Sequence, residues 1–337
     1  MPVRTSEGQR MRRREFISLI GGAAAGWPLS AGAQPRSMAV IGFLSGRAPE
    51  ESAHLIESYR RAVKEGGFVE GQNIAIEFRW ARGDYGRLPA LAADLVSRNV
   101  AVISAVGGDP SPLAAKAATA TIPIIFSFGG DPVRAGIVAS FNRPGGNATG
   151  ISTAVNMIEP KRLGLLRELA PGAALVGALI NSSYAPAVRQ ARDLEEATRA
   201  LGQHLIVAKA STDDELEAAF ASMAREGVGA LIVGADPYFD IRRDRIVALA
   251  AQQRLPTIYH FREYALAGGV MSYGQNFAEL YRQVGLYTAK ILSGAKPADL
   301  PVQQIDKFEL ITNLKAAREQ GIAISANLLS LADEVID

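Results

Sequence analysis

The sequence predicts an α/β protein with two mainly parallel β-sheets, and three observations support this class. Short apolar runs alternate with amphipathic segments along most of the 337 residues, which is typical of helices that cover a parallel sheet. The alternation begins a second time after "NATGIS" at residues 147–152. With 48% hydrophobic and 21% charged residues, the chain is long enough and apolar enough to bury two cores.

The first sheet is predicted from four apolar runs that are separated by amphipathic helices. Strands are expected at residues 38–45, 73–80, 100–106 and 122–128. Helices are expected at residues 50–67, from about Tyr85 and from Ser111. Because each strand is followed by a helix, the strands are expected to run parallel.

The second sheet repeats the same alternation. Helices are expected at residues 159–170, 185–202, 212–227 and 241–253, and strands at residues 174–180, 204–210, 230–235 and 256–260. A third section follows Gly268-Gly269, with a strand at 270–274, a helix at 278–295, a strand-like run at 307–312 and a helix at 314–321. If this section rejoins the first sheet, the chain crosses between two lobes more than once and forms a hinge.

The amino-terminal 33 residues are predicted to be an export signal. Arg12-Arg13-Arg14 precede a short apolar run, Arg13-Arg14-Glu15-Phe16-Ile17 resembles the twin-arginine motif, and "SAGA" favours cleavage after Ala33. The apolar run is too short to anchor the chain in a bilayer. There is no cysteine for lipid attachment or disulfides. A freely soluble periplasmic protein is expected.

The charge balance beyond residue 33 gives this chain no strongly basic surface for an anionic partner. That part contains 31 basic and 32 acidic residues, so nothing in it favours nucleic acid or an anionic membrane. Signatures of catalysis are also missing: there is no Walker loop, no Gly-x-Ser-x-Gly and no Gly-x-Gly-x-x-Gly after the first strand. His54, His204 and His260 lack metal-ligand spacing, so surface or core roles are expected. We therefore expect no enzyme activity, no metal and no cofactor.

A short Asp-Pro motif recurs after three apolar runs. It occurs as "GGDP" at residues 107–110 and 129–132, and as "GADP" at residues 234–237. Asp followed by Pro is a strong helix start, with Asp as the N-cap. For Asp131 we favour this capping role, whereas for Asp109 and Asp236 capping and ligand contact both remain open.

Polar and aromatic residues gather where the predicted strands end. The carboxyl edge of a parallel sheet is where ligands bind, because loops diverge there and helix N-termini present free N–H groups. The first lobe places Ser45 and residues 107–111 and 127–131 at this edge. The second lobe places there Asn181, Asp236, Tyr238, Tyr259 and, as a further candidate, Arg262. Two such edges that face each other form a cleft.

Several long segments resemble one family of bacterial transport proteins. These are "EGQNIAIEFRWARGDYGRLPALAADLV", "LAAKAATATIPIIFSFGGDPV", "IYHFREYALAGGVMSYG" and "LYRQVGLYTAKILSGAKPADLPVQQIDKFELITNLKAAREQGI". In order, they resemble the solute-binding proteins of an ABC-transporter family whose best-known members bind tryptophan, tyrosine and related amino acids. The resemblance runs from Ala39 to Ile336.

The resemblance implies a type I periplasmic binding protein fold, with two Rossmann-like lobes joined by three crossing segments. It places the N-terminal lobe at residues 38–150 plus 274–303 and the C-terminal lobe at residues 151–273 plus 304–337. The crossings are expected near residues 149–153, 269–273 and 303–307. A monomer would capture a small solute, with an amino acid as the first candidate, and deliver it to an ABC permease in the inner membrane. A periplasmic sensory receptor and a two-lobed nucleotide-sugar enzyme are the alternatives.

For an amino acid solute, the resemblance implies three kinds of contact. Backbone N–H groups and Ser111 suit the carboxylate, an aspartate suits the ammonium, and aromatic rings suit the side chain. The predicted ligand-binding residues are Ser45, Gly108, Asp109, Ser111, Ser127, Phe128, Asn181, Asp236, Tyr238, Tyr259 and Tyr273. Tyr281 and Tyr287 are expected to pack in the core. Asp109 departs from the family pattern, which more often has a small or hydroxyl residue there.

Overall fold

The computed structural model describes Pro2 and residues 38–155, 158–305 and 307–337. The predicted export signal at residues 1–33 and its cleavage after Ala33 lie outside these residues. Residues Met38–Asp337 form one unit. Within the described part, no helix has both the length and the apolar character that crossing a bilayer requires.

The first sheet has the strand order β11-β5-β4-β3-β1-β2, and all its pairs are parallel. Its strands are β1 (Ala39–Ser45), β2 (Ile74–Trp80), β3 (Val102–Val106), β4 (Ile124–Phe128), β5 (Ala148–Ser152) and β11 (Gln303–Gln304). Its helical segments are α2 (Ala53–Glu65), η1 (Tyr85–Arg87), α3 (Leu88–Ser97), α4 (Pro110–Ala118), α11 (Phe277–Leu292) and η3 (Pro297–Asp299). We call this assembly the N-terminal lobe.

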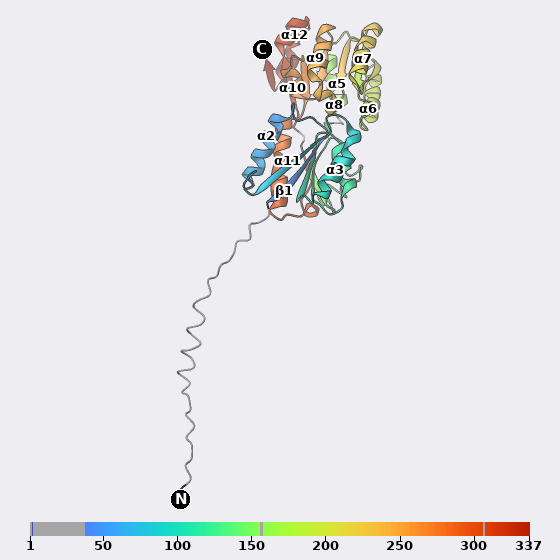
Figure 1. Cartoon of the computed structure of the whole chain (residues 1–337). Coiled ribbons are helices and arrows are strands. Elements are labelled where there is room, and N and C mark those ends of the chain that lie inside the picture. Colours follow the sequence, from blue (N-terminus) through green and yellow to red (C-terminus); the bar gives the residue numbers. More distant parts are fainter. Residues whose placement is uncertain (1, 3–37, 156–157, 306) are drawn as a thin grey trace. The chain divides into compact units, whose positions relative to one another are not determined.

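The alternation of side chains along β1 explains why helices cover both faces of this sheet. Ile41 and Phe43 pack with residues of α2 and α11, which lie side by side, whereas Leu44 packs with residues of α3 on the opposite face (Figure 1). Successive strand residues point to opposite faces, so a strand that is apolar throughout requires cover on both. The predicted helices provide this cover.

The second sheet has the order β13-β12-β10-β9-β8-β6-β7. Its strands are β6 (Leu175–Ile180), β7 (His204–Lys209), β8 (Ala230–Val233), β9 (Thr257–Tyr259), β10 (Met271–Gly274), β12 (Glu309–Asn313) and β13 (Glu334–Ile336). Its helices are α5 (Glu159–Leu169), α6 (Ala187–Ala200), α7 (Asp213–Glu226), α8 (Pro237–Ile241), α9 (Arg243–Gln252), α10 (Arg262–Leu266), α12 (Leu314–Gln320) and α13 (Ala326–Leu331). We call this assembly the C-terminal lobe. Its one antiparallel pair among the described strands is β10 with β12.

The chain passes between the two sheets after β5, after β10 and after β11. One side chain connects these three crossings. Gln275, directly after β10, donates through Nε2 to the carbonyl oxygen of Thr153 at 2.5 Å and to that of Ile305 at 2.8 Å. Gln275 is buried, so these hydrogen bonds are shielded from water.

The predicted fold class is confirmed, because the chain forms two α/β sheets that are mainly parallel. The differences concern single elements. Residues 148–152, expected to lie in a connection, form β5 inside the first sheet. The exposed edge strand β13 and the short helix α13 were not predicted. Asp131 begins a turn rather than a helix, although its side chain accepts from the N–H groups of Val133 and Arg134 as a capping residue does.

Candidate functional site

A cavity lies between the carboxyl edges of the two sheets. The N-terminal lobe lines it with Arg47, Gly107, Gly108, Asp109, Ser127, Phe128, Gly129, Phe277, Leu280 and Tyr281. The C-terminal lobe lines it with Tyr184, Ala235, Asp236, Pro237, Asp240 and His260, and the segment after β5 adds Thr153 and Val155. The strand ends therefore bring together residues that are far apart in the sequence, as expected for ligand sites in parallel sheets.

Five of the predicted ligand-binding residues line this cavity: Gly108, Asp109, Ser127, Phe128 and Asp236. Gly108 shows why glycine is needed at the first "GGDP". Its φ is 102°, and a Cβ there would lie 2.8 Å from Cγ of Pro237 in the other lobe. A side chain at this position would hold the two lobes apart. Contact of these five residues with a solute stays a prediction.

Four other predicted residues lie outside the lining of this cavity because the protein itself occupies their surroundings. Ser45 accepts a hydrogen bond from the N–H of Arg47 at 3.2 Å. Tyr259 is buried and stacks on Tyr264 with ring centroids 4.6 Å apart. Tyr273 stacks on Phe308. Ser111 is fully buried, and its Oγ has no hydrogen-bond partner in the described structure.

Asn181 and Tyr238 lie on a second, more open cavity at the mouth between the lobes. Asn181 donates to Asp236 Oδ1 at 3.2 Å. The hydroxyl of Tyr238 donates to Asp213 at 3.1 Å, and the guanidinium of Arg242 lies over the Tyr238 ring. Both side chains are buried, at 2% and 5% exposure, and they border this mouth rather than the first cavity.

Asp109 does not cap the helix that it precedes. Its backbone already has helical angles, and no capping hydrogen bond is made by its side chain. Its Oδ1 instead accepts from the N–H of Gly129 at 2.6 Å, which is the first glycine of the second "GGDP". This contact links the ends of β3 and β4 and holds a buried carboxylate against the cavity.

Asp236 caps α8 and also receives a hydrogen bond from the other lobe. Oδ1 accepts from the N–H groups of Tyr238 at 2.7 Å and Phe239 at 3.3 Å. Oδ2 accepts from the hydroxyl of Tyr85 at 2.9 Å. Burial raises the pKa of Asp236 to about 7, although the hydrogen bonds from Asn181 and Tyr85 oppose that rise. The capping role and the contact across the cleft thus belong to one carboxylate.

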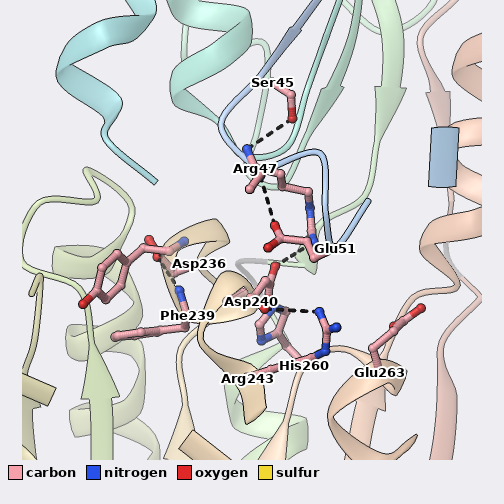
Figure 2. Close-up of polar contacts among 12 residues, drawn as sticks. Ser45, Arg47, Glu51, Asp236, Phe239, Asp240, Arg243, His260 and Glu263 are labelled. Carbon is pink, nitrogen blue, oxygen red and sulfur yellow. Dashed lines mark hydrogen bonds and ion pairs between the residues drawn. The ribbon is translucent and has the colours of Figure 1, made fainter. Parts of the chain in front are cut away.

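A buried charged cluster was not predicted. Arg47 of the N-terminal lobe pairs with Asp240 of α8 at 2.5 Å, and His260 Nε2 lies 3.0 Å from the other Asp240 oxygen (Figure 2). Burial favours a higher pKa for Asp240, but Arg47 and His260 outweigh it and lower that pKa. Burial lowers the pKa of His260. Asp240 is thus the partner of His260. His54 also has a partner, because it lies 2.8 Å from Glu263 in the other lobe.

Two sequence signals point to this cluster. Arg47 lies two residues beyond the apolar strand β1, at the edge where ligands bind. Asp240 lies four residues after the capping Asp236, one helical turn along α8. Among the described residues, no group of three or more His, Asp or Glu side chains is arranged to hold a metal ion.

Two α/β lobes with a cavity between their strand ends are the architecture of proteins that bind a solute by closing around it. The chain matches the model of the ABC transporter substrate binding protein family over residues 37–336, and it belongs to that family. It is 28% identical to the tyrosine-binding protein of Clostridioides difficile (strain R20291) over 270 residues, which are 79% of this chain and 77% of the relative.

Solved structures have the same fold. A conserved domain protein from Vibrio cholerae is 25% identical, with a TM-score of 0.80 over 88% of this chain and 99% of the other. A domain from Streptococcus pneumoniae in complex with L-Trp is 24% identical, with a TM-score of 0.79 over 89% and 100%. A ligand-free, open substrate binding protein with adhesive properties from Clostridium difficile is 26% identical, with a TM-score of 0.62 over 88% and 99%.

Proposed function

We propose that this protein captures an amino acid between its two lobes in the periplasm and delivers it to an ABC permease in the inner membrane. Aromatic and branched amino acids are the first candidates. The observation that carries the proposal is one cavity between the lobes, where the buried Arg47 and buried aspartates lie beside aromatic rings. The 28% identical tyrosine-binding relative supports the choice of solute class.

The cavity offers the two poles that a zwitterion requires. Arg47 supplies a cation after β1, and Asp109 supplies an anion after the neighbouring strand β3 of the N-terminal lobe. Phe128 and Phe277 add apolar surface for a side chain. Arg47 already pairs with Asp240, but its Nε and Nη1 groups have no acceptor among the described residues, so a solute that carries a negative group is the better match.

We infer that the lobes close around the solute. The lobes proposed to move are residues 38–150 with 274–303, and residues 151–273 with 304–337. Contacts across the cleft join Arg47 to Asp240, Tyr85 to Asp236 and His54 to Glu263. These three contacts support a closed arrangement here. A solute that contacts both lobes favours closure by its differential affinity.

The remaining steps of the proposal need no covalent chemistry from this protein. The closed monomer would dock on the permease, and the transporter's ATPase would supply the energy. Export through the twin-arginine-type signal at residues 1–33 would place the protein where the permease receives it. The family consists of binding proteins rather than catalysts, which supports a role without turnover.

A thermal-shift screen tests the solute class. The purified protein is heated with aromatic and branched amino acids, and in parallel with sugars, nucleosides and organic acids. A solute at 100 times its dissociation constant is expected to stabilise the protein by about 2.7 kcal/mol. Stabilisation by an amino acid supports the proposal.

Stabilisation by a nucleoside or sugar alone would contradict it. Isothermal titration of each stabilising compound then measures affinity and stoichiometry, with one solute per chain expected. Transport itself is tested by uptake of the labelled solute in cells with and without the gene. Normal uptake with loss of a transcriptional or chemotactic response would favour the sensory alternative.

A further inference from the structure

The guanidinium of Arg47 is the least satisfied charged group in the cavity wall. Arg47 is 2% exposed, and it donates through Nη2 to Asp240. Its Nε and Nη1 have no hydrogen-bond partner among the described residues. A guanidinium carries five N–H donors and stays protonated, so leaving most of them unpaired in a buried site is costly.

The surroundings of Arg47 hold its charge in place but leave those donors without an acceptor. The rings of Phe261 and Phe277 lie 4.9 and 5.1 Å from its Cζ, at cation–π distance. Aromatic rings stabilise the charge without accepting a directed hydrogen bond from each N–H. They also limit the directions from which an acceptor approaches.

Neither neighbouring carboxylate accepts from Nε or Nη1 of Arg47. Asp240 shares its oxygens between Arg47 and His260, and Glu51 accepts from the N–H of Ala48 at 3.2 Å (Figure 2). Arg47 lines the cavity, so an acceptor from outside the protein reaches it there. A carboxylate is the acceptor whose charge and geometry a guanidinium matches best.

We propose that Arg47 binds the carboxylate of the solute, so that Arg47 selects acids over their uncharged analogues. The inference rests on the proposed function and deepens it by assigning the recognition of the carboxylate to one residue. Because Arg47 also pairs with Asp240 of the other lobe, the carboxylate binds at a point where the lobes meet. Carboxylate binding and lobe closure are thereby coupled.

The test compares acids with their amides on matched variants. L-Tryptophan with L-tryptophanamide and L-leucine with L-leucinamide are titrated into the wild type, Arg47→Gln, Arg47→Lys and Arg243→Gln. Wild type is expected to prefer the acid about 100-fold or more, because Nε and Nη1 of Arg47 gain no charged acceptor when the amide binds. Arg47→Gln is expected to lose most of that preference, and Arg47→Lys to retain part of it.

Arg243→Gln is the matched control. Arg243 also lies beside Asp240, with Nη1 3.4 Å from its carbonyl oxygen, but it does not line the cavity. This variant removes the same charge and is expected to keep the wild-type preference. Circular dichroism and the melting temperature check that each variant folds. If Arg47→Gln does not fold, Arg47→Lys still tests the inference.

The outcomes separate this inference from the proposed function. Equal affinity of the wild type for acid and amide overturns the Arg47 inference while the amino acid proposal stands. An unchanged acid preference in Arg47→Gln also overturns the inference. Strong binding of an acid that lacks the ammonium, such as indole-3-acetate, with loss in Arg47→Gln supports the inference but contradicts the amino acid proposal. Absence of any acid among the binding compounds overturns both.

Discussion

The same dipeptide, Asp-Pro, performs three different tasks at three positions. Asp131 accepts from the N–H groups at the start of a turn, as a cap does. Asp236 caps α8 and receives the hydroxyl of Tyr85 from the other lobe. Asp109 accepts from Gly129 of the next loop and makes no cap. The dipeptide does not fix the backbone of its Asp, which is helical at Asp109 and extended at Asp236, and the partner of the carboxylate differs with it.

Substitution of Asp109 and Asp131 separates solute binding from capping. Asp109→Asn keeps an oxygen for Gly129 but loses the negative charge, so affinity for the amino acid is expected to fall about tenfold or more. Asp131→Asn is the matched control and is expected to bind normally. Asp131→Ala is expected to lose about 1 kcal/mol of stability with unchanged affinity. Titration calorimetry and denaturant unfolding give both quantities. Unaltered affinity in Asp109→Asn would exclude a role in holding the ammonium.

At the scale of the element, Gln275 is the side chain that connects the three crossing segments. A Gln275→Glu substitution places a carboxylate against two carbonyl oxygens, of Thr153 and Ile305, and removes the donor that both accept from. The unfolding free energy is expected to fall by about 2 kcal/mol or more at neutral pH. Part of the loss is expected to return near pH 4, because protonation restores one donor.

The control for this prediction is Gln304→Glu, which introduces the same charge at an exposed position on β11. Urea unfolding at both pH values is the measurement. If Gln304→Glu and Gln275→Glu are equally stable at neutral pH, the hydrogen bonds of Gln275 contribute nothing measurable to the hinge.

Most elements could be predicted because their apolar periodicity is local. β1 and β3 are continuous apolar runs, and α2 carries buried residues at helical spacing. β5 was not predicted because its sequence, "ATGIS", contains Gly150 and the polar residues Thr149 and Ser152. Its place in the sheet depends on close packing: a Cβ at Gly150 would lie 2.1 Å from the carbonyl oxygen of Phe126. β13 is short and exposed at an edge, so it carries no apolar signal.

The candidate site was harder to predict because it is formed by both lobes. Gly108, Asp109 and Phe128 follow from the rule that ligands bind at the carboxyl edges of strands. Arg47, Asp240 and His260 owe their contact to the way the two edges face each other, which no local pattern encodes. Tyr259 and Tyr273 end up against other aromatic rings, and only their packing partners reveal this.

At the scale of the whole molecule, polar contacts across the cleft link the protonation of buried groups to stability. Asp236 shows this most directly, because burial raises its pKa from an ordinary value of 3.8 to about 7. Between these two values the folded protein binds a proton at Asp236 that the unfolded chain does not bind. The contribution of Asp236 to the unfolding free energy is therefore present below pH 4 and is lost as the pH rises toward 7.

Asp236→Asn tests this linkage because it keeps an oxygen for the cap but cannot titrate. The unfolding free energy of the wild type minus that of Asp236→Asn is expected to fall by a few kcal/mol between pH 4.5 and 7.5, at no more than about 1.4 kcal/mol per pH unit. Urea unfolding over this range measures both proteins. Glu51 has its pKa raised to about 7 by burial as well, but it is present in both proteins, so its contribution cancels in the difference. Tyr85→Phe removes the hydroxyl that opposes the rise, so its unfolding free energy is expected to depend on pH at least as steeply as that of the wild type. A wild-type minus Asp236→Asn difference that stays constant with pH would mean that Asp236 remains ionised in the folded protein, and that its four donors outweigh the cost of burial.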